Sequence, residues 1–251
     1  MTNVLLRAAL VFLFLSSLQL QAQQAPSIDA TAVLRRASQS MGCSVLTPVT
    51  TISVAGSVHL ADGVTVMPVM IQSQGDRSWR SELVTAKERK VTVVNNGKGQ
   101  IQHADGRVQN LTENNTSHQP PMHIPCLTGL AAPPGRLTAT YLRTETTAAD
   151  SLDVVKLMPN FQGPKQFAGR LKLTLWISRS TGYLVKLQYV NSAEQDSEDT
   201  QTVEIDYSDY RVIDGLAVPF TQVTQSDGKL VFDLRLDSVQ LNTPAADFSL
   251  R

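Results

Sequence analysis

The side chains best suited to chemistry are few and do not form a recognised catalytic pattern. His123 and Cys126 are three residues apart, a spacing that on a helix would bring both near one metal ion. Pro125 between them disfavours that geometry, so we predict no metal site. The sequence has four histidines, none with the paired helical spacing of a zinc protease: His59, His103, His118 and His123.

The sequence also lacks the common nucleophile and nucleotide motifs. No Gly-x-Ser-x-Gly elbow, Walker loop or dinucleotide fingerprint occurs, so we predict no catalytic residue and no cofactor. A triad assembled from distant residues would make the protein a hydrolase, which we keep as an alternative. The acidic residues between 194 and 199 lack the spacing of a calcium loop and are interpreted as a solvated hairpin tip.

Composition indicates a globular protein. The chain has 22 basic and 22 acidic residues, with 42% hydrophobic and 18% charged residues. An apolar content of this size allows a real core and argues against global disorder. Because there is no basic excess, nucleic-acid binding is disfavoured.

The N-terminal residues have the pattern of an export signal. Arg7 is followed by the apolar run AALVFLFL at positions 8–15, which is too short to span a membrane. We predict a signal peptide over residues 1–22, cleaved after Ala22 or alternatively Ala25, and a single domain over residues 23–251. An uncleaved anchor helix is the alternative. The mature protein is then periplasmic or secreted.

Export places Cys43 and Cys126 in an oxidising space, where an even pair of cysteines tends to bond. We therefore predict a disulfide, with two separate buried thiols as the alternative. Closing a loop of this length should stabilise the fold by about 4–5 kcal/mol in the chain-entropy model.

Hydrophobic periodicity predicts one amphipathic helix at the start of the mature chain. Asp29 is suited to cap it, residues 30–40 are mostly good helix formers, and Gly42 suits its end. One face holds Ala32, Val33, Ala37, Ser40 and Met41, whereas Arg35, Arg36 and Gln39 lie on the other.

From residue 51 the period changes to two, which predicts about ten or eleven strands joined by short turns. Pro68 indicates that the second strand is an edge strand or has a bulge. The proline-rich segment 112–136 interrupts the series, and Ile124–Ala132 within it could form a short helix that carries Cys126.

These elements predict a mainly β fold of the α+β class. Two helices cannot cover both faces of so large a sheet, so the strongly curved antiparallel sheet should form an unclosed barrel with a small helical lid. Its concave face would be apolar and could hold a ligand, with a fully packed core as the alternative.

The C-terminal strands resemble those of the LolA/LolB-like superfamily, which includes periplasmic lipoprotein carriers. Residues 203–248 carry the likeness, and a longer chain with the 112–136 insertion indicates a branch distinct from the carriers themselves. The carriers' gating arginine has no unique counterpart among Arg35, Arg36, Arg77 and Arg80. The motifs are Tyr207-Ser208-Asp209-Tyr210-Arg211, Ile213-Asp214-Gly215-Leu216, Val218-Pro219-Phe220 and Ser226-Asp227-Gly228, followed by Leu236–Thr243 and Phe248.

The resemblance implies a soluble, non-catalytic carrier or binding protein for lipid or lipoprotein acyl chains. We also expect a monomer. The alternative is an interaction or sensor module with a packed core, which binds an envelope protein through strand edges or the acidic loop 191–200. The candidate lipid-binding residues are Ile52, Val54, Val58, Leu173, Leu175 and Leu187 from the sheet, with Met122, Ile124, Leu127 and Leu130 from the lid.

Overall fold

A single antiparallel sheet dominates the computed structural model. The structure describes residues 28–46, 51–75, 78–84, 89–96, 98–111, 123–128, 130, 137–159, 172–192, 200–244 and 247–250. The strands are β1 (Thr51–Leu60), β2 (Val66–Gln74), β3 (Ser78–Val84), β4 (Arg89–Asn95), β5 (Lys98–Gln102), β6 (Val108–Leu111), β7 (Leu137–Thr146), β8 (Ser151–Pro159), β9 (Leu173–Ser178), β10 (Leu184–Ser192), β11 (Thr200–Ile213), β12 (Leu216–Ser226) and β13 (Lys229–Leu241).

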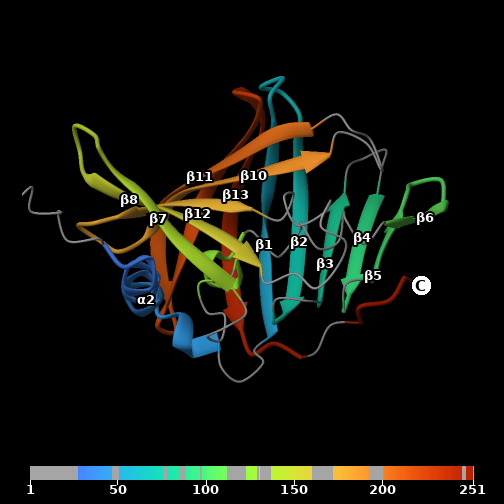
Figure 1. The fold of residues 1–251 in the computed structure, drawn as a ribbon. Coiled ribbons are helices and arrows are strands. Elements are labelled where there is room, and N and C mark those ends of the chain that lie inside the picture. Colours follow the sequence, from blue (N-terminus) through green and yellow to red (C-terminus); the bar gives the residue numbers. More distant parts are fainter. Residues whose placement is uncertain are drawn as a thin grey trace, which may run out of the picture.

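The strand order shows that the sheet is unclosed. It runs β6-β5-β4-β3-β2-β1-β13-β12-β11-β10-β9-β8-β7, so β6 and β7 are the two edges. Every neighbouring pair is consecutive in the chain except β1 and β13, which join two meanders along the middle of the sheet. The sheet curves strongly, and its β7–β9 end folds across the front of the β1 region in Figure 1. The predicted fold, a curved unclosed barrel with a small helical lid, is confirmed.

Short turns with left-handed residues set the strand pairing. At the β12–β13 hairpin, Asp227 and Gly228 have φ of +48° and +74°, and Ser226 pairs with Lys229. Two successive positive φ values are typical of a two-residue type I′ turn, whose twist matches that of the flanking strands. The tight turn therefore fixes which residues share a face of the sheet.

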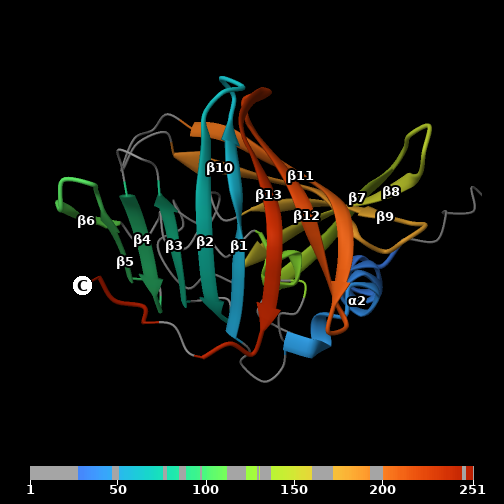
Figure 2. The same ribbon diagram turned by 180° about the vertical axis from the view of Figure 1, so that it is seen from behind.

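Helix α2 (Ala30–Ser40) begins and ends where the sequence predicts. The Asp29 carboxylate accepts a hydrogen bond from the Thr31 N–H at 2.9 Å. Gly42, with φ +68°, follows the C-cap residue Met41. The helix lies against the β7–β9 end of the sheet in both views (Figures 1 and 2).

The disulfide between Cys43 and Cys126 is confirmed. It joins two 3-10 turns, η1 (Cys43–Leu46) and η2 (Pro125–Leu127), with 5.3 Å between the two Cα atoms. The predicted helix over Ile124–Ala132 is wrong, because its described part contains only the turn η2. The Thr128 N–H and hydroxyl both donate to the Pro125 carbonyl, at 3.0 and 2.6 Å, and these bonds close the turn after three residues.

Two strand predictions also need correction. Within the described residues the sheet has 13 strands rather than ten or eleven, since the chain after the Asp214–Gly215 turn forms a further long strand, β12. Strand β2 is not an edge strand, because β1 and β3 flank it. Pro68 is tolerated because it pairs with Ser57 of β1, while the ladder with β3 begins only at Val69.

Candidate functional site

The concave face of the sheet carries an apolar surface that crosses most of its width. We use this term for the face on which the Ile52, Val54 and Val58 side chains lie. Directly opposite residues of neighbouring strands share a face, so the register extends this surface from β1 in both directions. For example, Val54 pairs with Ile71 of β2 and Val239 of β13. Figure 2 shows the opposite, convex side of the same strands.

The predicted lining residues come together on this surface. Leu173 is half-buried against the core, and Met122 lies outside the described residues. The others are buried members of one contiguous core: Ile52, Val54, Val58, Ile124, Leu127, Leu130, Leu175 and Leu187.

Sequence reasoning missed much of the same surface. The alternating pattern indicates which side chains of one strand are buried. Only the strand register shows which residues of neighbouring strands lie beside the predicted ones on the same face. Leu175, for example, pairs with Val155 of β8 and Leu187 of β10. Additional members of the core are Val69, Ile71, Val155, Leu157, Ile205, Tyr207, Leu216, Val218, Phe220, Leu234, Leu236 and Val239.

Residues 123–128 and 130 cover part of the concave face, and we call them the roof segment. Besides the disulfide to η1, a polar contact holds this segment to the sheet. The Gln222 side chain, buried on β12, donates to the His123 carbonyl at 2.9 Å. The apolar side chains Ile124, Leu127 and Leu130 pack into the core beneath it. The roof segment is thus held by a disulfide and a hydrogen bond, and its apolar side chains pack on the sheet.

The imidazole of His123 is buried in this segment. Burial lowers the pKa of His123 from 6.5 to about 4, because the interior disfavours the charged ring. Its Nε2 is buried and has no hydrogen-bond partner among the residues that the structure describes. The ring is therefore neutral at pH 7.

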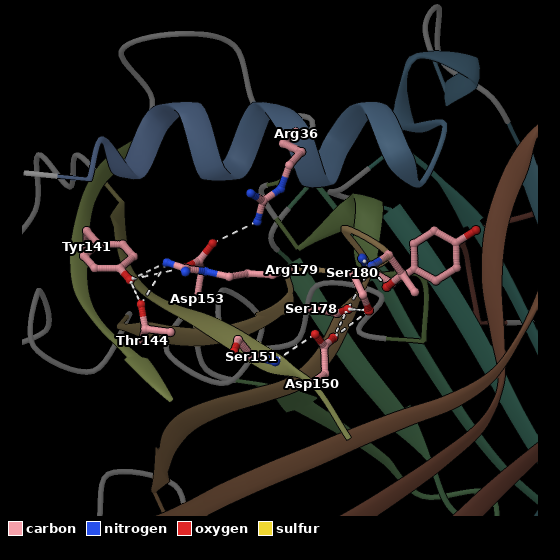
Figure 3. A network of polar contacts seen from close by, with 11 residues as sticks. Arg36, Tyr141, Thr144, Asp150, Ser151, Asp153, Ser178, Arg179 and Ser180 are labelled. Atoms are coloured by element: carbon pink, nitrogen blue, oxygen red, sulfur yellow. Dashed lines mark hydrogen bonds and ion pairs between the residues drawn. The ribbon is translucent and has the colours of Figure 1, made fainter. Parts of the chain in front are cut away.

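A buried carboxylate fixes helix α2 to the sheet (Figure 3). Asp153 lies on β8 opposite Ile177, on the concave face, and its side chain is 2% exposed. The Arg36 Nη2 atom donates to Oδ2 at 2.8 Å, and the Arg179 Nε atom donates to Oδ1 at 2.7 Å. The Tyr141 hydroxyl donates to Oδ1 at 3.1 Å. We call these four residues the Asp153 cluster.

The cluster keeps Asp153 ionised. Burial alone would raise the pKa of Asp153, but the hydrogen bonds from Arg36, Arg179 and Tyr141 outweigh it and lower the pKa below the ordinary value. The amphipathic pattern predicted that Arg36 lies on a purely solvated helix face, and this prediction is wrong. It joins α2 to a strand 117 residues away in the sequence.

The turn after β9 brings α2 close to the sheet. Gly182 has φ +76°, and a Cβ atom there would lie 2.3 Å from the Ser40 Oγ atom of the helix. The hydroxyls of Ser178 and Ser180 donate to the Asp150 carboxylate, which holds this turn in shape (Figure 3). These hydrogen bonds fix the turn against which the helix packs, so the role of the three residues is structural.

Within the described ranges, no group of three or more His, Cys, Asp or Glu side chains could hold a metal ion. Cys126 is consumed by the disulfide. Among the described helices, none has the length and apolar character needed to cross a bilayer.

Comparison with known proteins shows similarity in structure rather than in sequence. No family model matches the chain, and no curated protein matches it. A LolA superfamily protein from Nitrosomonas europaea superposes with a TM-score of 0.56 at 14% identity, covering 87% of this chain and 96% of that one.

Two other solved structures are similar to the same extent. A domain assigned to the outer membrane lipoprotein-sorting proteins of Vibrio parahaemolyticus gives a TM-score of 0.54 at 9% identity, covering 87% of this chain and 94% of that one. A DUF1329 family protein from Desulfovibrio piger gives 0.54 at 11% identity, covering 87% and 95%. The chain therefore has a LolA-like fold, and the resemblance seen in its C-terminal strands is confirmed at the level of the fold.

Proposed function

We propose that this protein is a non-catalytic binding protein for the acyl chains of lipids or lipoproteins, acting after export in the periplasm or outside the cell. The observation that carries the proposal is the concave apolar face, which continues from the sheet into the roof segment. Ile124, Leu127 and Leu130 contact the sheet through side chains of the same kind as an acyl chain. An acyl chain can therefore replace contacts of this interface with equivalent apolar contacts.

The energetics of such a site require no catalytic group. Each methylene transferred from water into an apolar interior gains about 0.8 kcal/mol. A chain of sixteen carbons thus gains on the order of 10 kcal/mol before the costs of ordering the chain and separating the roof segment are subtracted. The apolar contacts alone therefore supply the driving force for binding.

The similarly folded Vibrio protein supports the proposal, since it is assigned to lipoprotein sorting. The predicted signal peptide over residues 1–22 and single domain over 23–251 would deliver the protein to the compartment in which such cargo is exchanged. The proposed cargo is a hydrophobic lipid or acylated protein, bound by a monomer.

The test is lipid capture by the mature chain. Native mass spectrometry of gently purified protein is expected to show bound lipid, and the delipidated protein should bind a fluorescent fatty acid that unlabelled palmitate displaces. Val58→Phe, on the concave face, should weaken probe binding several-fold. The matched control Met70→Phe lies on the convex face, is half exposed, and should leave binding unchanged. A protein that carries no lipid and binds no displaceable probe contradicts the proposal.

A further inference from the structure

Two buried polar groups on the concave face have no hydrogen-bond partner among the described residues. Ser73 of β2 is 1% exposed and Trp79 of β3 is 8% exposed. Within the part of the chain that the structure describes, the Ser73 Oγ and the Trp79 Nε1 atoms are both buried without a hydrogen-bond partner. Buried donors of this kind are costly to leave unpaired, and each calls for a partner such as a ligand or an ordered water molecule.

The sheet register places the two groups side by side. Ser73 and Trp79 are directly opposite each other in the β2–β3 ladder, so their side chains start from one face with Cβ atoms about 5 Å apart. Ser73 is also opposite Ile52 of β1, which belongs to the apolar core. Both donors therefore lie at the border of the apolar surface that we assign to the acyl chain.

The chemistry of the face differs between these two regions. In the middle of strands β8 to β10 its residues are aliphatic and fully buried, as at Val155, Leu175 and Leu187. On β2 to β4 the same face holds Ser73, Trp79 and Thr92, all buried, beside apolar residues such as Ile71. A molecule with one apolar end and one oxygen-bearing end fits an aliphatic region on β8 to β10 and two unpaired donors on β2 and β3.

From this arrangement we infer that Ser73 and Trp79 form the subsite for the polar end of the bound lipid, donating hydrogen bonds to an ester or carboxylate oxygen. The inference rests on the proposed function and adds the orientation of the ligand to it. The acyl chain extends from β2–β3 toward β8–β10 beneath the roof segment. A hydroxyl and an indole N–H suit an oxygen acceptor, since the indole N–H can only donate.

The first experiment compares probes that share a chain and differ in the polar end. The delipidated mature protein is titrated with 1-palmitoylglycerol, with palmitate and with hexadecane. The double variant Ser73→Ala/Trp79→Phe should lose about tenfold in affinity for the probe whose oxygen is recognised, as expected for one to two lost neutral hydrogen bonds. Its affinity for hexadecane should stay unchanged. The ester and carboxylate arms identify which oxygen is bound.

The control variant makes the same chemical change on the other face. Ser53 of β1 is opposite Gln72, the residue before Ser73, and therefore faces the convex side. Ser53→Ala should leave all three affinities unchanged. An equal loss for hexadecane and the oxygen-bearing probes, or no loss for either, overturns the subsite while leaving acyl binding established. Failure of the unmodified protein to bind any of the three overturns the proposed function as well.

A second readout does not depend on the double variant folding. The sequence contains two tryptophans, and Trp176 donates its N–H to Glu145 at 2.9 Å from a convex position. In Trp176→Phe, emission therefore comes from Trp79 alone. Palmitate brominated next to the carboxylate should quench it more strongly than palmitate brominated near the methyl end. Equal quenching, or the reverse order, overturns the orientation.

Stability separates a ligand subsite from a structural one. In the ligand-free protein, Ser73→Ala should keep or raise the melting temperature, because it removes a donor that the fold leaves unpaired. A water molecule bound permanently between Ser73 and Trp79 predicts the opposite: a lowered melting temperature and unchanged lipid affinity. That result overturns the inference.

Discussion

The two ends of the sheet are built by different means. The end that bears the helix, strands β7–β12, which we call the helix half, contributes most of the contiguous core together with α2 and the roof segment. Among the described residues, the strands β3–β6, which we call the distal half, contribute no fully buried member to that core, and only Leu83 packs against it. The contiguous core is thus built where the small helical elements cover the sheet, and the buried apolar residues of the distal half lie outside it, namely Trp79, Val91, Val93 and Val94.

The charged groups of the two halves differ in the same way. Each half has one carboxylate that binds two arginines. Asp153 is 2% exposed and its partners Arg36 and Arg179 are distant in the sequence, whereas Glu82 is 23% exposed and pairs with its near neighbours Arg80 and Arg89. A buried cluster between distant segments holds tertiary structure, whereas a surface pair between neighbours does so weakly. We therefore expect side-chain contacts to stabilise the tertiary structure of the helix half more than that of the distal half.

The largest expected effect comes from the disulfide. Reduction, or the double variant Cys43→Ala/Cys126→Ala, should lower the free energy of unfolding by about 4–5 kcal/mol, because it frees a loop of 83 residues in the unfolded chain. Thermal denaturation with and without dithiothreitol measures this. The reductant should have no effect on the double variant, and an unchanged melting curve for the unmodified protein contradicts the prediction. Hydrogen exchange should rise first in α2 and the roof segment, before β4.

The next effect compares the two carboxylates directly. Asp153→Ala should cost about 1–3 kcal/mol of unfolding free energy, since it removes the hydrogen bonds by which Arg36, Arg179 and Tyr141 join α2 and neighbouring strands to β8, while the two arginines, 43% and 39% exposed, stay partly hydrated. Glu82→Ala, which also removes a carboxylate with two arginines, should cost below about 1 kcal/mol. Urea denaturation of both variants measures the difference. Equal costs would show that the two halves are fixed alike.

Mild acid should weaken the roof segment. The pKa of His123 is lowered to about 4 by burial, so the unfolded chain takes up a proton below pH 6.5 while the folded chain does not. The buried neutral ring therefore contributes to the free energy of unfolding in full above pH 6.5. This contribution, up to about 3 kcal/mol, is lost as the pH falls toward 4. Asp153 has a lowered pKa, so its contribution is lost at still lower pH.

The variant His123→Phe isolates that titration. Its unfolding free energy, measured by urea denaturation from pH 7 to 4.5, should fall less steeply than that of the unmodified protein. The matched variant His103→Gln, in the hairpin between β5 and β6, should retain the steep fall. A slope that is the same for His123→Phe and the unmodified protein would remove His123 as its cause.

Features of this structure that depend on neighbouring residues in the chain could be predicted from the sequence, whereas features that depend on residues far apart in the chain could not. Helix α2 has the predicted cap at Asp29, and β1 begins at Thr51, where the sequence changes to a period of two, because caps and period-two patterns are local. The disulfide could be predicted because only two cysteines exist. Arg36 was misplaced because its partner lies 117 residues away, and an acidic residue at an inward position of the apolar strand β8 is the signal that could have located it.

The candidate site shows the same limit. Its apolar residues could be predicted one strand at a time, as at Val54 and Leu175. The pairing of Ser73 with Trp79 can be known only from the register of β2 and β3. That both side chains are buried without a hydrogen-bond partner among the described residues cannot be inferred from either strand alone. Local pattern therefore predicts the surface, whereas the long-range pairing decides where polar groups interrupt it.

The smallest expected effect tests how the distal half is covered. The Arg80 guanidinium donates through Nη1 to the Ser249 carbonyl at 2.8 Å and the Asp247 carbonyl at 3.4 Å, and it also pairs with Glu82. Arg80→Ala should therefore release residues 247–250 while costing below about 1 kcal/mol of unfolding free energy, because these contacts are exposed. Carboxypeptidase digestion should then shorten the variant faster than the unmodified protein. Arg89→Ala removes only the other partner of Glu82, so it should leave the digestion rate unchanged. If both variants are digested alike, the C-terminal residues are held by something other than Arg80, and the distal half is fixed more firmly than its side-chain contacts indicate.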